Sequence, residues 1–215
     1  LALISIAHPD FRDELFSHAR RMGLLAMEQL QKGTITGVYP LRLEKMLEID
    51  GKAVTIRPAK PVDARRIQEH FYNLDPDDVV ARFFHRKERF NGQEAEKVSQ
   101  VDYINNLTIV AVVGESGFGR VIGIGEYLLD PEVNMAEIAY SISGKWQHKG
   151  LGSLIQEKLA EGARGNGIAG LYAYTTPENQ GMIRLFEKLP YRIETGEEDE
   201  MLVLRGRFDE PVTRA

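Results

Sequence analysis

Gln147-His148-Lys149-Gly150-Leu151-Gly152-Ser153 lies between an apolar segment and the start of an amphipathic helical pattern. Its two glycines let the backbone approach an anion closely, and the first amides of the following helix have no partner inside that helix. Those amides, together with the positive end of the helix dipole, attract a phosphate or a pyrophosphate. Glycines at this spacing also permit a simple tight turn, so the loop alone leaves both interpretations open.

Two common phosphate-binding motifs do not match this loop. A Rossmann fingerprint needs a third glycine three residues after Gly152, where the sequence has Ile155. A Walker loop needs Gly-Lys followed by Ser or Thr, which does not occur. What remains is a Gln-x-x-Gly-x-Gly pattern between a strand and a helix.

The segments around the loop predict a mixed α+β fold. Three apolar runs upstream read as strands of an antiparallel meander, and a helix starting at Leu151 is followed by a strand, a helix that Pro190 ends, and a closing hairpin around an acidic loop. The predicted strands are 107–113, 121–129, 135–142, 168–175, 191–194 and 201–208.

The first half of the chain predicts helices and one tight hairpin. Apolar residues at helical spacing favour one or two helices over 10–32, with Asp10 as N-cap, before a linker near 33–40. Asp50-Gly51 stands between alternating apolar residues, which is typical of a hairpin turn. Further helices are expected after Pro61 and over 76–84 and 91–102.

Glu137 is a candidate general base. Alternation within the predicted strand places Ala136, Ile138, Tyr140 and Ile142 on one face and Glu137 on the other, among apolar neighbours. A partly buried carboxylate has a raised pKa, which suits it to accept a proton from an ammonium group. The pattern fits equally well a glutamate on the solvated face of an antiparallel strand.

Three segments, in order and spacing, resemble the GCN5-related N-acetyltransferase (GNAT) family: the strand 136–142, the loop 147–153 and the segment Glu178-Asn179-Gln180-Gly181-Met182. The similarity covers about residues 53–208. It is closest to the bacterial protein lysine acetyltransferase branch, which shares the Ala-Glu-Ile-Ala-aromatic strand. The resemblance implies the GNAT fold, acetyl-CoA as cosubstrate, and an amine acceptor that receives the acetyl group directly.

The resemblance also implies roles for individual residues. Glu137 matches the catalytic glutamate of that branch, and a backbone amide of the 140–142 segment is expected to stabilise the oxyanion. Phe186 stands where many members have a tyrosine that protonates the departing thiolate, so either the thiolate leaves unaided or Tyr140, Tyr172 or Tyr174 serves. Asn179 either caps the last helix or contacts the pantetheine arm. The expected cofactor-binding residues are Tyr140, Ser141, Ile142, Gln147, His148, Lys149, Gly150, Leu151, Gly152, Ser153, Asn179 and Phe186.

The leading segment predicts a separate origin. Residues 3–12 and the helical segment after them resemble the extreme C-terminus of acetyl-CoA hydrolase/transferase enzymes, and the chain begins with Leu1 rather than Met. We therefore expect residues 1–40 to be the tail of a preceding CoA-transferase-like domain and residues 41–210 to be the GNAT domain. An ordinary N-terminal helix of the same domain is the alternative.

Composition restricts the partners. Lys and Arg total 27 against 32 Asp and Glu, a net charge of −5, which argues against a nucleic-acid partner. The absence of cysteine excludes disulfides and thiolate chemistry and suits the cytoplasm. No apolar run is long enough to span a membrane, and the histidines have no metal-ligand spacing.

The sequence leaves the acceptor open. A protein lysine and a small amine are both compatible with the motifs. A regulatory module that senses acetyl-CoA without turning it over is a third hypothesis. An acidic groove would favour a protein lysine, and an enclosed pocket would favour a small amine.

Overall fold

The protein was analysed as a computed structural model that describes residues 4, 7, 9–25, 37–84, 92–114 and 119–212. Its strands form one mixed, mostly antiparallel sheet in the order β1-β2-β3-β4-β5-β6-β8-β7. The strands are β1 (Lys45–Ile49), β2 (Lys52–Pro58), β3 (Asn106–Val113), β4 (Arg120–Asp130), β5 (Met135–Ile142), β6 (Gly170–Thr175), β7 (Tyr191–Glu198) and β8 (Met201–Pro211). The α-helices are α2 (Pro9–Arg21), α3 (Ala64–Tyr72), α4 (Pro76–Phe83), α5 (Gly92–Ser99), α6 (Leu151–Gly165) and α7 (Gln180–Glu187), and 3₁₀ turns cover Leu41–Leu43, Pro61–Asp63 and Gly144–Trp146.

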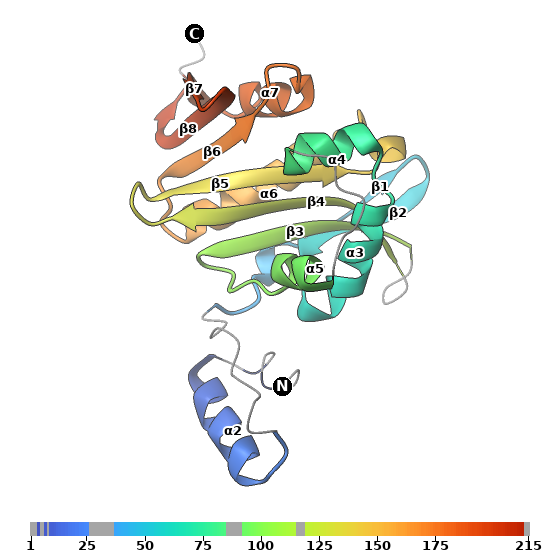
Figure 1. The fold of residues 1–215 in the computed structure, drawn as a ribbon, viewed down its shortest axis with the longest axis vertical. Coiled ribbons are helices and arrows are strands. Elements are labelled where there is room, and N and C mark those ends of the chain that lie inside the picture. Colours follow the sequence, from blue (N-terminus) through green and yellow to red (C-terminus); the bar gives the residue numbers. More distant parts are fainter. Residues whose placement is uncertain are drawn as a thin grey trace.

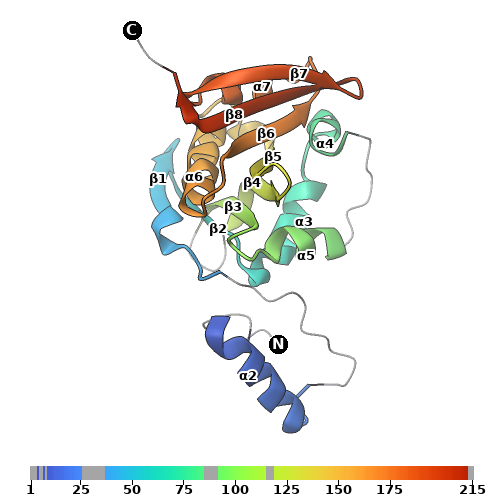
Figure 2. The same cartoon turned by 90° about the vertical axis from the view of Figure 1, so that its left-hand side faces the viewer.

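Helices cover both faces of the sheet, while α2 lies apart from it (Figures 1 and 2). On one face α6 packs on β3, β4 and β5 over a core that includes Ile109, Ile138, Ile155 and Leu159. On the other face α3 and α5 pack over a second apolar cluster around Phe71. The same face carries α4, which contacts β5.

The predicted meander is confirmed, because β3, β4 and β5 pair antiparallel in succession and β5 has the predicted bounds. Asp50 and Gly51 both have positive φ, as a tight turn between β1 and β2 requires. The closing hairpin is longer than predicted: β7 continues to Glu198, because Asp199 and Glu200 both adopt positive φ and turn the chain in two residues.

The start of the chain differs from the prediction in detail. α2 begins at Pro9, so Asp10 lies inside the helix instead of capping it, and the helix ends at Arg21. Positions 26–32 of the predicted helical region and positions 33–36 of the predicted linker lie outside the described residues.

Gly125 on β4 permits the close packing of α6 on the sheet. A Cβ at this position would overlap Cγ2 of Ile155 and would lie 2.9 Å from Cδ1 of Tyr140 and 3.1 Å from Cδ1 of Leu159. Overpacking a filled core costs about 1–3 kcal/mol. We therefore expect Gly125→Ala to lower the free energy of unfolding by that amount in urea titrations. Gly92→Ala, where an added Cβ meets no atom within 4 Å, is the control and should not show this loss.

Candidate active site

β5 and β6 pair only over a short distance and then diverge. Their parallel ladder joins Met135, Ala136 and Glu137 to Gly170, Leu171 and Tyr172, whereas the ladder between β5 and β4 continues to Ile142. Beyond Glu137 one edge of β5 therefore has no neighbouring strand. A cavity of about 910 Å³ lies along this edge.

Four parts of the chain line this cavity. They are the second half of β5, the loop that enters α6, the start of α7 with the end of β6, and the inner side of α4. Many lining residues of α4 and α7 are exposed, so the cavity is an open groove and not an enclosed chamber.

The loop before α6 has the geometry of an anion cradle. Gly150 is the N-cap residue in a left-handed conformation, with φ of 81°, and no side chain caps this end of the helix. A Cβ on Gly152 would lie 3.2 Å from Leu185 and 3.3 Å from Ile142, closer than side chains normally allow. The first amides of α6 are thus left for a ligand beside the cavity, which fits a pyrophosphate at the positive end of the helix.

Gln147 connects this loop to α4. Its side-chain amide donates to both carboxylate oxygens of Asp78, at 3.0 and 2.9 Å, and to the backbone carbonyl oxygen of Ile142 at 3.0 Å. Burial raises the pKa of Asp78, and the neighbouring Asp75 and Asp77 act in the same direction, while the bond from Gln147 opposes them. The role of Gln147 is to hold the loop against the wall of the groove.

The backbone of β5 directs amide groups toward the groove. The amide of Ser143 donates to the carbonyl oxygen of Ile122 at 2.9 Å, which defines a hydrogen-bonded pair of the β4–β5 ladder. Because such pairs alternate along an antiparallel ladder, the N–H groups of Tyr140 and Ile142 point away from β4. They face the side from which β6 has diverged, where an oxyanion could accept a hydrogen bond.

Glu137 lies at the point of divergence, opposite Tyr172 across the β5–β6 ladder, and lines the groove. It is half-buried, and burial raises the pKa of its carboxyl group; Arg82 opposes this shift, whereas Glu126 and Asp130 add to it. A carboxylate with a raised pKa is a better proton acceptor than an ordinary surface glutamate.

The structure brings most of the predicted site residues to this groove. Asn179 lines it and also caps α7, because its side-chain oxygen accepts from the amide of Met182 at 3.1 Å. Two residues lie elsewhere: Phe186 is fully buried in the core, and Lys149 forms an ion pair with Asp50. The residues at the groove are Glu137, Tyr140, Ser141, Ile142, Gln147, His148, Gly150, Leu151, Gly152, Ser153 and Asn179.

Sequence reasoning missed two contacts beside the site. Nε2 of the buried His70, on α3, lies 3.0 Å from Oγ of Ser141, although the two residues are 71 positions apart. Arg82, on α4, forms an ion pair with Glu126 on β4, 44 positions away. No local motif marks either pair, since each exists only when helices from the first half of the chain pack on the meander.

The tyrosines considered as proton donors have different surroundings. The hydroxyl of Tyr140 is enclosed and has no hydrogen-bond partner among the residues that the structure describes, and burial raises its pKa. Tyr174 lines the groove but donates to Glu198 at 3.1 Å, which raises its pKa. Burial and the charge of Glu137 raise the pKa of Tyr172 to about 12.

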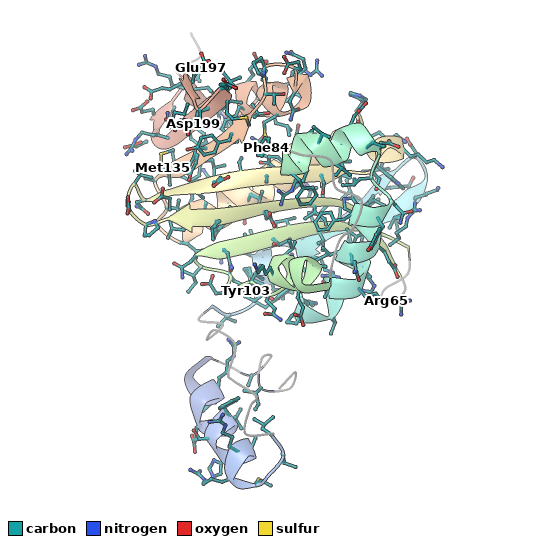
Figure 3. The ribbon with its side chains drawn as sticks, viewed as in Figure 1. Arg65, Phe84, Tyr103, Met135, Glu197 and Asp199 are labelled. Atoms are coloured by element: carbon teal, nitrogen blue, oxygen red, sulfur yellow. The ribbon has the colours of Figure 1, made fainter. Side chains whose placement is uncertain are left out.

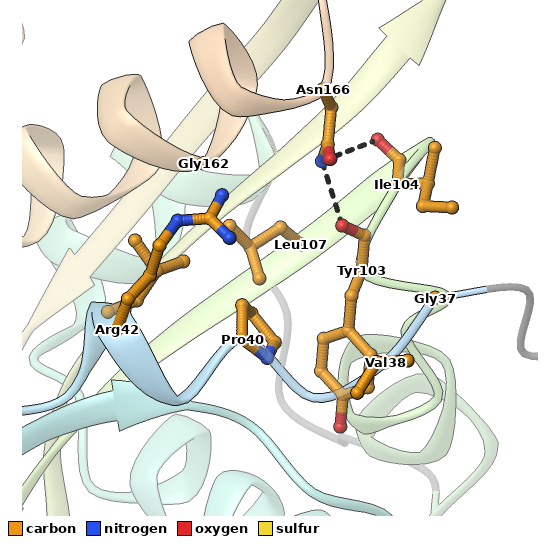
Figure 4. Close-up of a pocket in the computed structure, with 10 residues that line it drawn as sticks. Gly37, Val38, Pro40, Arg42, Tyr103, Ile104, Leu107, Gly162 and Asn166 are labelled. Carbon is orange, nitrogen blue, oxygen red and sulfur yellow. Dashed lines mark hydrogen bonds between the residues drawn. The ribbon is translucent and has the colours of Figure 1, made fainter. Parts of the chain in front are cut away.

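A smaller hollow of about 230 Å³ lies at the other end of α6 (Figure 4). There Asn166 donates to the carbonyl oxygen of Tyr103 at 2.8 Å and to that of Ile104 at 3.4 Å. The guanidinium of Arg42 lies against the last turn of α6, where a Cβ on Gly165 would overlap it. A cation is favourable at a helix C-terminus, so the contact of Arg42 with α6 helps to hold the segment before β1 in place. None of the predicted site residues lines this hollow.

Comparison with known proteins shows the family to which this chain is related. The model of the Acetyltransferase (GNAT) family matches residues 69–191, more than half of the chain. The chain is 29% identical over 133 residues to the acetyltransferase PA5475 of Pseudomonas aeruginosa, covering 62% of this chain and 72% of that protein. The solved GNAT domain of S. lividans PAT superposes with a TM-score of 0.70 at 23% identity, covering 79% of this chain and 99% of that one.

A second solved structure has the same fold. The GNAT superfamily phosphinothricin acetyltransferase from Sinorhizobium meliloti, determined in complex with AcCoA, superposes with a TM-score of 0.57 at 16% identity and covers 75% of this chain and 92% of that one.

The diverging strands, the helix N-terminus and the groove thus define an acetyl-CoA-dependent N-acetyltransferase. The chain belongs to the GNAT family, whose enzymes use acetyl-CoA as cosubstrate. Among the helices that the structure describes, none has the length and apolar character needed to cross a membrane.

Proposed function

We propose that this enzyme transfers the acetyl group of acetyl-CoA to the side-chain amine of a protein lysine, with Glu137 as the general base. The observation that carries the proposal is the position of Glu137: a half-buried carboxylate at the point where β5 and β6 diverge, beside backbone amides that point toward the groove. A base and an oxyanion donor on the same strand are what a direct acyl transfer requires.

Each group in the proposed reaction has a defined task. Glu137 accepts a proton from the ammonium group of the acceptor, directly or through a water molecule, which frees the nitrogen lone pair to attack the thioester carbonyl carbon. The N–H of Tyr140 or Ile142 donates to the carbonyl oxygen as negative charge develops there. When the C–S bond breaks, the electron pair leaves with the sulfur. The second proton on the acceptor nitrogen passes to the departing thiolate or to water, and the neutral amide product remains. Acetyl-CoA supplies the activated acetyl group.

The surroundings of the tyrosines favour departure of the thiolate without a protein acid. Phe186 has no proton to give, and the hydroxyl of Tyr140 is enclosed. The hydroxyl of Tyr174 is bonded to Glu198, and Tyr172 is not among the described residues that line the groove. A thiol with an ordinary pKa near 8.5 is a good leaving group as the thiolate, so no proton donor is needed at the moment of cleavage.

The charge around Glu137 supports a cationic acceptor. Glu126, Asp130 and Glu137 lie on neighbouring strands. Arg82 pairs with Glu126 and Arg205 pairs with Glu198, so these charges offset one another, and Arg184 and Lys188 line the groove further along. The acidic excess is therefore local to Glu137 and Asp130. Glu197 and Asp199 add acidic groups at the β7–β8 hairpin (Figure 3). An open groove with acidic groups around Glu137 suits a lysine that protrudes from a basic protein segment.

Two other functions remain compatible with the site. A small amine could enter the same groove, and a regulatory module could bind acetyl-CoA without transferring its acetyl group. The open groove and the acidic wall favour the lysine acceptor over the small amine. The half-buried carboxylate beside the exposed amides favours turnover over sensing.

The proposal extends to the native polypeptide. We infer that the acetyltransferase domain follows a CoA-transferase-like module there, and the support is the resemblance of residues 3–12 and the helical segment after them to the end of acetyl-CoA hydrolase/transferase enzymes. An endogenous protein no larger than this chain would contradict that arrangement.

The acceptor can be tested with paired peptides. A lysine peptide flanked by Arg and Lys should be acetylated with a kcat/KM about tenfold or more above that of the same peptide flanked by Glu, because charge complementarity favours encounter and binding, and added salt should narrow the difference. The measurements are thiol release from acetyl-CoA and the mass of the peptide. Release with small amines alone would overturn the lysine assignment, and calorimetric binding of acetyl-CoA without release for any acceptor would indicate a sensor.

A further inference from the structure

The helix α4 forms one wall of the groove and is attached to the rest of the domain near both of its ends. Near its start, Asp78 accepts two hydrogen bonds from Gln147 of the cofactor loop. Near its end, Arg82 reaches across to Glu126 on β4. The two attachments connect α4 to the cofactor end and to the Glu137 end of the same groove.

The pair at the end of α4 is largely withdrawn from solvent. The side chain of Arg82 is 12% exposed, and that of Glu126 is 27% exposed. Another nitrogen of the Arg82 guanidinium donates to Glu126, while Nε is buried and has no hydrogen-bond partner among the described residues. Removing one partner of such a pair has a larger effect than breaking a pair on an open surface, because it leaves the other charge uncompensated where solvent is largely excluded.

Several charged or titratable groups face Glu137 from the elements packed around it. Arg82 approaches from α4, Glu126 and Asp130 from β4, and Tyr172 from β6. Burial and the two acidic neighbours raise the pKa of Glu137, whereas Arg82 lowers it. The pKa of Tyr172, about 12, keeps its hydroxyl neutral near pH 7.

We propose that Arg82 and Glu126 are a positioning pair for the transfer reaction: their ion pair fixes the α4 wall beside Glu137 and supplies the positive charge that favours the ionised form of that carboxylate. Neither side chain needs to touch the acceptor. The inference rests on the proposed role of Glu137 as general base and extends it to the groups that keep this base ready at working pH.

The two partners have opposite expected effects on the pH profile of kcat/KM. A general base must be ionised, so activity falls as the pH drops through its pKa. Arg82→Gln removes the attraction between the guanidinium and the Glu137 carboxylate and should move this acidic limb measurably to higher pH. Glu126→Gln removes a repulsion and should move the limb to lower pH. The double variant should return the limb close to its original position.

The experiment measures kcat/KM from pH 5 to 9 with one lysine peptide, so that the titration of the peptide is the same for every variant. Arg82→Lys keeps the charge and should keep the limb within a few tenths of a pH unit. Arg65→Gln breaks an exposed pair with Glu69 on α3, away from the groove, and is the matched control; its profile should not move (Figure 3).

A limb that stays in place in Arg82→Gln and in Glu126→Gln, or that moves in the same direction in both, would overturn the positioning role. That failure is distinct from failure of the proposed function, which Glu137→Gln tests separately: an inactive Glu137→Gln with unmoved limbs in the other two variants removes this inference alone. If Arg82→Gln does not fold, the acidic limb of Glu126→Gln is compared with that of Arg82→Lys instead. The limb should move to lower pH in Glu126→Gln and stay in place in Arg82→Lys.

Discussion

The Glu137→Gln enzyme is expected to turn over about 10²- to 10⁴-fold more slowly than the wild type, the range that a positioned general base contributes. Glutamine has nearly the same shape as glutamate but does not accept the proton of the ammonium group. Glu137 lies on β5, away from the loop that starts α6, so the binding of acetyl-CoA should change little. The measurements are kcat from thiol release and the dissociation constant of acetyl-CoA from calorimetry.

Glu132→Gln is the matched control for this variant. Glu132 lies exposed in the turn between β4 and β5, so the same change in charge there should leave kcat unaltered. Equal turnover of Glu137→Gln and wild type, with a lysine peptide that is a good substrate, would remove Glu137 from the mechanism. A large loss of acetyl-CoA affinity would assign Glu137 to cofactor binding instead of proton transfer.

Acidification should destabilise the fold through His70, by about 3 kcal/mol between pH 7 and pH 4. The side chain is 2% exposed, and burial lowers its pKa from 6.5 to about 4, although hydrogen bonds to the backbone of Val121 and Ser141 oppose the shift. As the pH falls below 6.5, the unfolded chain binds a proton at this histidine and the folded chain does not. The free energy of unfolding therefore falls until the pH reaches about 4, where the folded state is protonated as well.

Carboxylates also titrate in this range, so the contribution of His70 is read from a difference. Denaturant titrations at pH 7 and pH 4 give the loss of stability on acidification for the wild type and for His70→Gln, and the variant should lose about 3 kcal/mol less. His18→Gln, at an exposed position on α2, should behave like the wild type. The same loss in His70→Gln and in the wild type would show that His70 does not carry the effect.

The strands of the sheet could be predicted from the sequence because burial leaves a periodic signal. The continuous apolar run of β3 and the alternation of Ala136, Glu137 and Ile138 in β5 both follow from the face that each strand buries. The length of the β7–β8 hairpin could not be predicted, since Asp199 and Glu200 turn the chain by adopting positive φ, which is uncommon for both residue types.

The candidate site was predictable where a short segment contains the chemistry. The glycines at 150 and 152 indicated the cradle, and Glu137 stood out as a charge among apolar neighbours. Phe186 was expected beside the cofactor from a matching position in the last helix, but the structure buries it fully in the core. The contacts of Arg82 with Glu126 and of His70 with Ser141 depend on tertiary packing, which leaves no mark on sequence spacing.

The short ladder between β5 and β6 also separates the sheet into two parts with different roles. The strands up to β5 carry Glu137 and the amides proposed to bind the oxyanion, and they lead into the helix proposed to hold the pyrophosphate. The ribbon of β6, β8 and β7 carries Tyr174 on the far wall of the groove, with Glu198 bonded to it. Only Met135, Ala136 and Glu137 join these halves by strand pairing. The far wall can therefore diversify to suit new acceptors while the catalytic half keeps its sequence, and grafting a foreign ribbon is a natural route to altered selectivity.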